Sequence, residues 1–399
     1  MNKMMLFLGA GASKRFGIKT MEGMSEEFEN KADEILKDGE REVHLDIKNI
    51  LGSNNLEDIL TVLNDLTKES PNPSVRYLKT NLEETTVGLE LLGPLKGMKE
   101  VPVELLKRLS SDFSPALKDS KLSQELQSKI IHFIKENCVL EEKVEKLEDI
   151  IRVYDQLFEI LKFNLGPIFD IFTTNYDIII EKYYDLLTWE YYFEKKYDYG
   201  ENLRRISYAD GFFSIAFTAS GGSIDIADGY YAWNPKRYDE IIKYANNKDI
   251  PTIRLFKLHG SIDQYIEGDK IVKRDILYST PTTNGEERLE SMIYPMREKE
   301  VYKDPFFELF ARLKTSLLSE KICIVIGYSF GDEHIRNIFF DAVKRNQKIK
   351  ILFGNRNPDE VIKNLEPIKD NIIPIEGEFG KETFFEKLKE ELEKYKNNS

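Results

Sequence analysis

Four short segments of the sequence place glycine or polar side chains directly after an apolar run. They are GAGAS at 9–13, TTNYD at 173–177, KLHGSID at 257–263 and GYSFGDEH at 327–334. Short apolar runs without alternation are typical of strands that a parallel sheet buries on both faces. Because open α/β sheets bind ligands at the carboxyl ends of such strands, each motif is a candidate ligand or catalytic segment.

The GAGAS motif favours a phosphate-binding turn. Closely spaced glycines after a strand let backbone N–H groups approach a pyrophosphate at the start of a helix. The spacing departs from G-x-G-x-x-G, since Gly17 comes six positions after Gly11. A tight turn without a ligand is the alternative, and the motif alone does not separate the two. The sequence has no G-x-x-x-x-G-K-[ST], which excludes a P-loop NTPase.

The TTNYD motif and the GYSFGDEH motif also admit two interpretations each. Asn175 and Asp177 are suited to a ligand site, but the same residue types commonly cap a following helix. Ser329 is placed to meet a ribose or a phosphate, whereas His334 is better explained by packing or capping.

His259 is the best candidate for a catalytic base among the four histidines. It stands between an apolar run and a glycine, where a positioned base is expected. A hydrogen-bonded turn histidine would have the same placement. His44 and His132 lie in charged helical surroundings and are expected on the surface.

Composition narrows the classes of function. The 57 Lys and Arg against 70 Asp and Glu give a net charge of −13, which argues against generic nucleic-acid binding. Two cysteines exclude a disulfide framework and a cysteine-rich zinc module. There is no apolar run of about 18 residues that would predict a membrane span. We expect a cytoplasmic protein.

The order of apolar runs predicts a doubly wound, mostly parallel, Rossmann-like α/β sheet with a large helical insertion. We assign 1–24 and 165–399 to the nucleotide-binding domain and 25–164 to the insert. A heptad pattern over 140–161 fits either a coiled coil or a packed helix, and a stretch rich in Tyr and Phe at about 185–250 suggests an irregular lobe. Pro374 restricts the last run to an edge strand. The expected strands are 4–8, 168–172, 253–258, 322–326, 349–353 and 372–375.

Taken in order, the four motifs resemble those of the sirtuin-like domain, and especially its bacterial branch of NAD-cleaving defence proteins. The resemblance covers most of 1–20 and 165–375. It implies that Asn175 and Asp177 line the nicotinamide-ribose pocket and that His259 is the catalytic base. It also implies NAD+ binding, at the pyrophosphate or the adenosine side, by Gly9, Ala10, Gly11, Ser13, Thr174, Gly327, Ser329 and Asn355.

Departures from the deacylases of this family favour water as the acceptor. Those enzymes usually carry a four-cysteine zinc module and a glutamine at the second position of the TTNYD motif, where this chain has Thr174. We therefore expect a metal-independent NAD+ glycohydrolase that releases nicotinamide and ADP-ribose. The alternatives are a metal-independent NAD-dependent deacylase and a silent NAD- or ADP-ribose-binding scaffold. The resemblance further implies NAD+ depletion in antiphage defence, by a homo-oligomer partnered with a HerA-like ATPase.

Overall fold

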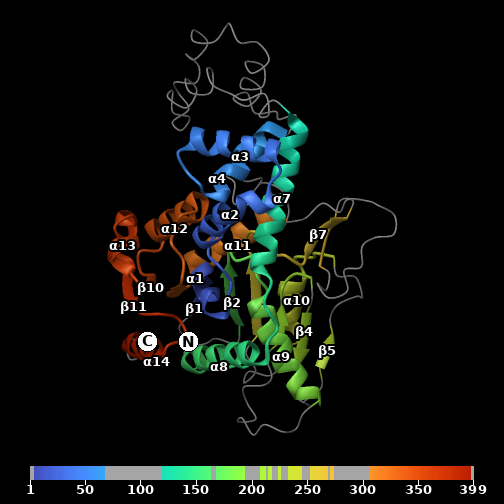
Figure 1. Ribbon diagram of the computed structural model, residues 1–399. Helices are drawn as coiled ribbons and strands as arrows, with labels where there is room; N and C mark the ends of the chain where they lie inside the picture. The colour runs from blue at the N-terminus through green and yellow to red at the C-terminus, as the bar shows by residue number, and fades with distance from the viewer. Residues whose placement is uncertain are drawn as a thin grey trace. The chain divides into compact units, whose positions relative to one another are not determined.

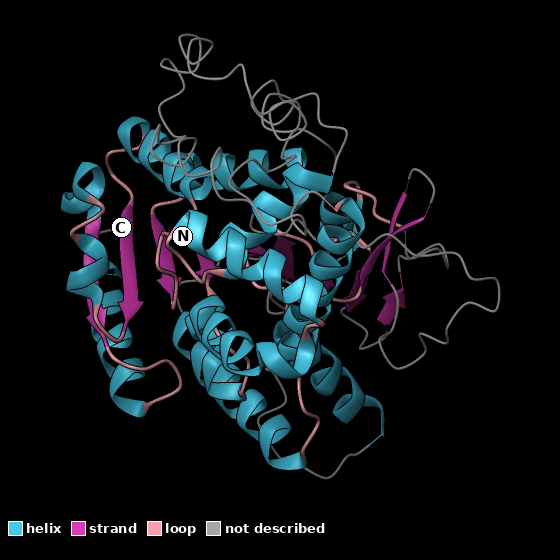
Figure 2. Ribbon diagram, turned by 45° about the horizontal axis from the view of Figure 1, so that its top comes forward, coloured by secondary structure: helices cyan, strands magenta, loops and turns pink. Residues whose placement is uncertain are grey.

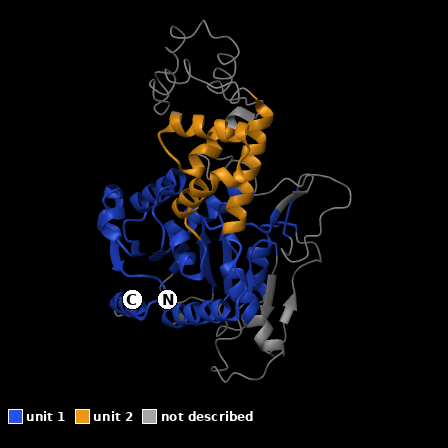
Figure 3. Ribbon diagram, viewed as in Figure 1, with its two compact units in different colours: residues 1–18, 138–293, 300–399 blue, residues 19–137, 294–299 orange. Residues whose placement is uncertain are grey.

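The chain divides into two compact units (Figure 3). Unit 1 comprises 1–18, 138–293 and 300–399, and unit 2 comprises 19–137 and 294–299. Unit 2 differs from the expected insert at its carboxyl end, because helix α8 (Val144–Lys162) belongs to unit 1. The computed structural model describes residues 4–67, 119–162, 168–193, 207–212, 214–217, 223–225, 232–244, 252–267, 270–273 and 305–396.

Unit 1 is built on a sheet of nine described strands in the order β11-β10-β9-β1-β2-β6-β3-β4-β5 (Figure 1). The seven strands from β11 to β3 are parallel, and β4 and β5 add antiparallel strands at one edge. This confirms the predicted mostly parallel α/β sheet. The strands are β1 (Met4–Leu8), β2 (Ile168–Thr173), β3 (Ser207–Ala209), β4 (Ser214–Phe217), β5 (Ser223–Asp225), β6 (Thr252–Lys257), β9 (Ile322–Ile326), β10 (Lys350–Asn355) and β11 (Ile372–Glu376).

Strand β1 lies where the strand order reverses. The chain continues from β1 to β2 and β6 on one side, and later occupies β9, β10 and β11 on the other. In doubly wound sheets the crevice for a ligand opens at the carboxyl ends of the strands at this switch point. The GAGAS motif follows β1 directly and is therefore at the centre of that edge.

Both faces of β1 are buried, as its unalternated apolar sequence predicts. Leu6 and Leu8 pack into a core with α8, α9 and α14, whereas Met5 and Phe7 pack into a second core with α11 and α12. Figure 2 shows the strands between helices. The helices named here are α9 (Ile179–Phe193), α11 (Phe306–Ser319), α12 (Glu333–Arg345) and α14 (Glu382–Lys396).

The heptad-patterned helix α8 is part of this core. Tyr154, Phe158 and Leu161 are buried in the same core as Leu6 and Leu8 of β1. Val144, at the start of α8, is 70% exposed. Ring contacts join Phe158 to Phe169 on β2, with centroids 6.2 Å apart. The apolar stripe is thus covered within the chain, which favours the packed helix over the coiled coil.

Several shorter elements complete unit 1. The expected edge position of the last strand is confirmed, since among the described strands β11 pairs only with β10, where Pro374 lies opposite Phe353. Much of 185–250 lies outside the described residues, and its described parts include strands β3, β4 and β5 as well as a helix. The remaining elements are α1 (Ala10–Ser13), η1 (Lys14–Phe16), α10 (Arg237–Tyr244), β7 (Gln264–Glu267), β8 (Lys270–Lys273), α13 (Pro358–Ile362) and η6 (Glu366–Asn371).

Unit 2 is helical in its described part. Phe28 of α2 contacts Phe133 of α7 edge to face, with ring centroids 5.2 Å apart. The expected surface position of His44 is wrong: it is 1% exposed, because its ring packs against Phe28 in the helical core. No helix in the described residues of either unit is long and apolar enough to span a membrane. The helices of unit 2 are α2 (Met21–Ile35), α3 (Asp38–Leu51), α4 (Leu56–Thr67) and most of α7 (Ser120–Cys138).

Candidate functional site

The GAGAS motif is pressed against the turn that follows β9. Gly9 N donates to Ile326 O over 2.9 Å, and Gly11 N donates to Gly327 O over 2.8 Å. A Cβ atom built on Gly9 would lie 2.5 Å from the Tyr328 Cα, and one on Gly11 would lie 2.8 Å from the Gly327 Cα. Gly327 itself has a φ of 65°, which favours glycine. The glycines are therefore required by backbone packing, whatever else they bind.

Asn175 joins the TTNYD motif to the GAGAS motif. Its Nδ2 donates to Gly9 O over 3.1 Å and to Ser13 Oγ over 3.0 Å. Thr173 holds the turn, since its Oγ1 accepts from Asn175 N and donates to Leu8 O. Both amide protons of Asn175 are thereby committed, and its orientation is fixed.

The other end of the Asn175 amide is available to a ligand. Asn175 Oδ1 is buried, and no described residue donates a hydrogen bond to it. A buried acceptor without a donor is costly, so such an atom favours a site where a bound hydroxyl or water donates.

Asp177 has the helix-capping contact that was the alternative to ligand binding. Its Oδ1 accepts from Ile179 N over 3.1 Å at the start of α9, and the side chain is 5% exposed. The neighbouring Thr174 is half-buried. The contacts of Asp177 thus support the loop that carries Asn175.

His259 lies next to the same loop. Ser261 Oγ and Ile262 N both donate to Tyr176 O, over 3.2 and 3.1 Å. These bonds bring the KLHGSID motif beside the TTNYD motif, as expected from the adjacent strands β2 and β6. His259 is 4% exposed, and its Nε2 lies 2.9 Å from Asp332 Oδ2.

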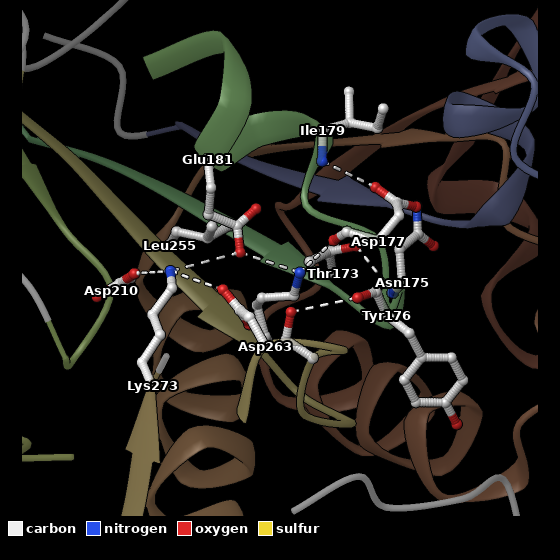
Figure 4. Close-up of polar contacts among 12 residues, drawn as sticks. Thr173, Asn175, Tyr176, Asp177, Ile179, Glu181, Asp210, Leu255, Asp263 and Lys273 are labelled. Atoms are coloured by element: carbon white, nitrogen blue, oxygen red, sulfur yellow. Dashed lines mark hydrogen bonds and ion pairs between the residues drawn. The ribbon is translucent and has the colours of Figure 1, made fainter. Parts of the chain in front are cut away.

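A buried charged cluster supports these two loops, and sequence analysis did not identify it. Figure 4 shows the side chains of Glu181, Asp210 and Asp263 gathered around the end of Lys273. Lys257 Nζ donates to the Asp177 carbonyl and lies 3.0 Å from Glu181 Oε1. In the sequence, the feature that could have indicated this cluster is Lys257, a lysine at the end of an apolar strand.

Lys273, on β8, completes the cluster. Its Nζ lies 2.6 Å from Asp210 Oδ2 and 3.4 Å from Asp263 Oδ2. Burial raises the pKa of Glu181, and the ammonium groups of Lys257 and Lys273 oppose that rise. The acidic and basic groups of the cluster therefore stabilise one another in their ionised forms.

The residues assigned to the adenosine side lie across β1 from Asn175 and His259. Ser329 is exposed after β9. Asn355 ends β10, where its Oδ1 accepts from Asn357 N over 3.1 Å in a local turn. The strand order therefore places the expected NAD+ contacts on both sides of β1, with the GAGAS motif, including half-buried Ala10, between them.

The described residues hold no group of three or more His, Cys, Asp or Glu side chains arranged to bind a metal ion. No curated protein matches the sequence at a significant level. A family model described as the SIR2-like domain matches residues 170–369, half of the chain. The match includes three of the four motifs and leaves out the GAGAS motif, whose contacts with Asn175 and Gly327 the structure provides.

Proposed function

The chain belongs to the SIR2-like domain family, and on that premise we propose that it hydrolyses NAD+ to nicotinamide and ADP-ribose. The family implies an NAD-related activity; hydrolysis is the finer claim. The observation that carries it is the Asn175 amide, held by Gly9 and Ser13 with a buried Oδ1 that no described residue engages. A ribose hydroxyl or the attacking water would donate to that oxygen.

The proposed reaction breaks the bond between the ribose C1′ and the nicotinamide nitrogen. The bonding electron pair leaves with nicotinamide, which departs neutral and needs no proton. Water then adds to the oxocarbenium-like C1′, and His259 accepts the proton that the water loses, directly or through a ribose hydroxyl. A positioned base of this kind contributes about 10²–10⁴-fold to the rate. Asp177 keeps the Asn175 loop in place through its cap on α9.

Binding is assigned by motif to the edge at β1. Gly9, Ala10, Gly11, Ser13 and Thr174 would contact the pyrophosphate and the nearby ribose. The adenosine side would meet Gly327, Ser329 and Asn355. Turnover in this scheme uses no metal ion.

The resemblance of the motifs also supports a biological role. In this proposal the protein acts in the cytoplasm and depletes NAD+ during phage infection, as a homo-oligomer controlled by a HerA-like ATPase. An unregulated NAD+ hydrolase would deplete the NAD+ of its own cell, which is the reason to expect such control.

The proposal is tested by incubating the purified chain with NAD+, with and without a HerA-like ATPase, and separating the products by chromatography. We expect equal amounts of nicotinamide and ADP-ribose, unaffected by a chelator. His259→Ala should lower the rate by about 10²–10⁴-fold, and His132→Ala, a change at a histidine whose side chain is 74% exposed, should leave the rate unchanged. Binding of NAD+ without nicotinamide release would favour the scaffold. Deacetylation of an acetyl-lysine peptide without free ADP-ribose would favour the deacylase.

A further inference from the structure

The carboxylate of Asp332 connects two motifs. Its Oδ2 lies 2.9 Å from His259 Nε2. Its Oδ1 accepts from His334 N over 2.9 Å and from Ile335 N over 3.3 Å, which caps α12. The side chains of His259 and Asp332 are 5% and 10% exposed, so the pair is largely shielded from water.

The turn between β9 and Asp332 has a strained backbone at Phe330. Phe330 has a φ of 56° and is the one non-glycine residue with a positive φ in the described ranges. Bulky residues adopt this conformation rarely, and it persists where the surroundings enforce it. The Phe330 ring is 2% exposed and packs against Phe339 and Phe353, with centroids 5.1 and 5.8 Å away. Packing thus fixes the backbone two residues before Asp332.

We propose that Asp332 is a positioning residue for His259, a role that rests on the proposed hydrolysis of NAD+. A carboxylate that is paired with one nitrogen of an imidazole ring fixes the tautomer and the orientation of that ring. The proton is then held on Nε2, and the lone pair that takes a proton from water is on Nδ1. The same carboxylate stabilises the imidazolium that forms when the ring is protonated.

The competing explanation is that Asp332 only caps α12, and Asp332→Asn separates the two. Asparagine and aspartate are equally good N-caps, so this variant keeps the cap and the melting temperature. It removes the negative charge and allows an amide to donate to the ring, which favours the other tautomer. We expect kcat for NAD+ cleavage to fall about 10²-fold, within the range for a positioned base, with KM unchanged.

The same substitution in a His259→Ala background should cause no further loss, because residues that act as a unit are not additive. A wild-type kcat in Asp332→Asn, or an equal loss in both backgrounds, would overturn the proposal. Asp332→Ala serves as the cap control and should lower the melting temperature.

A measurement that does not depend on turnover tests the role of Asp332 separately from the hydrolysis of NAD+. The chain has four histidines, and ¹⁵N NMR of histidine-labelled protein, assigned with His259→Gln, reports the tautomer of each. We expect the Nε2–H form for His259 in the wild type and a mixed form in Asp332→Asn. That result without NAD+ cleavage would reject hydrolysis and retain the role of Asp332. An Nδ1–H form in the wild type, or an unchanged spectrum in Asp332→Asn, would reject the role of Asp332.

Discussion

Both units bury charged side chains, but the buried ion pair of each unit contacts a different kind of structural element. In unit 1, Lys257 is 5% exposed and its ammonium contacts Glu181 and the carbonyl of Asp177, in the loop that carries Asn175. In unit 2, Glu40 is fully buried and pairs with Lys129, which also donates to the carbonyl of Ile35. The first pair is bound to a motif loop, and the second holds helices to one another.

A buried charge is therefore not in itself a mark of a functional site. Removing one member of either pair should destabilise the protein, since the remaining charge loses its partner. Only the unit 1 pair should also affect chemistry, because its loss releases the loop next to His259.

Lys257→Met should lower the free energy of unfolding by about 3–5 kcal/mol, because the buried Glu181 loses its nearer ammonium partner and keeps only Lys273, whose Nζ is 3.9 Å away. The double variant Lys257→Met/Glu181→Met should recover most of that stability, since apolar residues commonly replace a buried pair without loss. It should not recover NAD+ cleavage, because the Asp177 carbonyl still lacks its donor. Urea denaturation and product analysis measure the two effects, and wild-type turnover in the double variant would contradict the distinction.

Asn175→Ala should reduce NAD+ cleavage by about 10²–10³-fold, the usual effect of losing one positioned polar group. Asn371 offers a matched control in the same unit. Its amide, like that of Asn175, donates two hydrogen bonds, here to the carbonyls of Gln347 and Ile349 next to the amino end of β10. Asn371→Ala should affect stability and leave turnover unchanged. Equal losses of turnover in the two variants would show that the Asn175 effect is structural.

Lys129→Met should lower the free energy of unfolding by about 1–3 kcal/mol, because the buried Glu40 carboxylate loses a hydrogen-bond donor. Lys121, on the same helix, has a side chain that is 81% exposed. Lys121→Met should change the stability by less than about 0.5 kcal/mol. Thermal unfolding of the two variants makes the comparison, and indistinguishable melting temperatures would remove the stabilising role of the unit 2 pair.

The buried His44 should make stability depend weakly on pH. Burial lowers its pKa below 6.5, and the hydrogen bond that the ring donates to Glu29 only partly offsets this. The native state therefore binds fewer protons than the unfolded chain, so this stabilisation is complete above pH ~6.5 and is lost as the pH falls below it. Between pH 7.5 and 5.5 we expect a loss of at most about 1.4 kcal/mol, equivalent to one pH unit.

Urea midpoints at the two pH values for the wild type, His44→Gln and His132→Gln check this expectation. His44→Gln should remove the extra loss and His132→Gln should not. The same pH dependence in all three proteins would assign the effect to other groups.

Six strands of unit 1 (β1, β2, β6, β9, β10 and β11) could be predicted from local sequence, as could the position of Asn175 and His259 after two of them, whereas the short strands β3, β4, β5, β7 and β8 could not. Unalternated apolar runs mark strands that are buried on both faces, and Asn175 and His259 follow such runs directly. The contact between His259 and Asp332 could not be predicted, because it depends on how the turn after β9 folds. The membership of α8 in unit 1 was also missed, since its heptad pattern identifies an apolar stripe but not the surface that covers it. His44 was misplaced for a related reason: charged neighbours in sequence do not show which face of a helix is buried.

The edge strand β11 affects how copies of the chain can associate. An exposed sheet edge usually presents a row of N–H and C=O groups that can recruit a strand from another molecule. Pro374 lies in the middle of β11 and has no N–H to offer. Sheet extension across this edge is therefore disfavoured, which protects β11 from pairing with a strand of another copy. A homo-oligomer of this chain is accordingly not expected to form by strand pairing at β11.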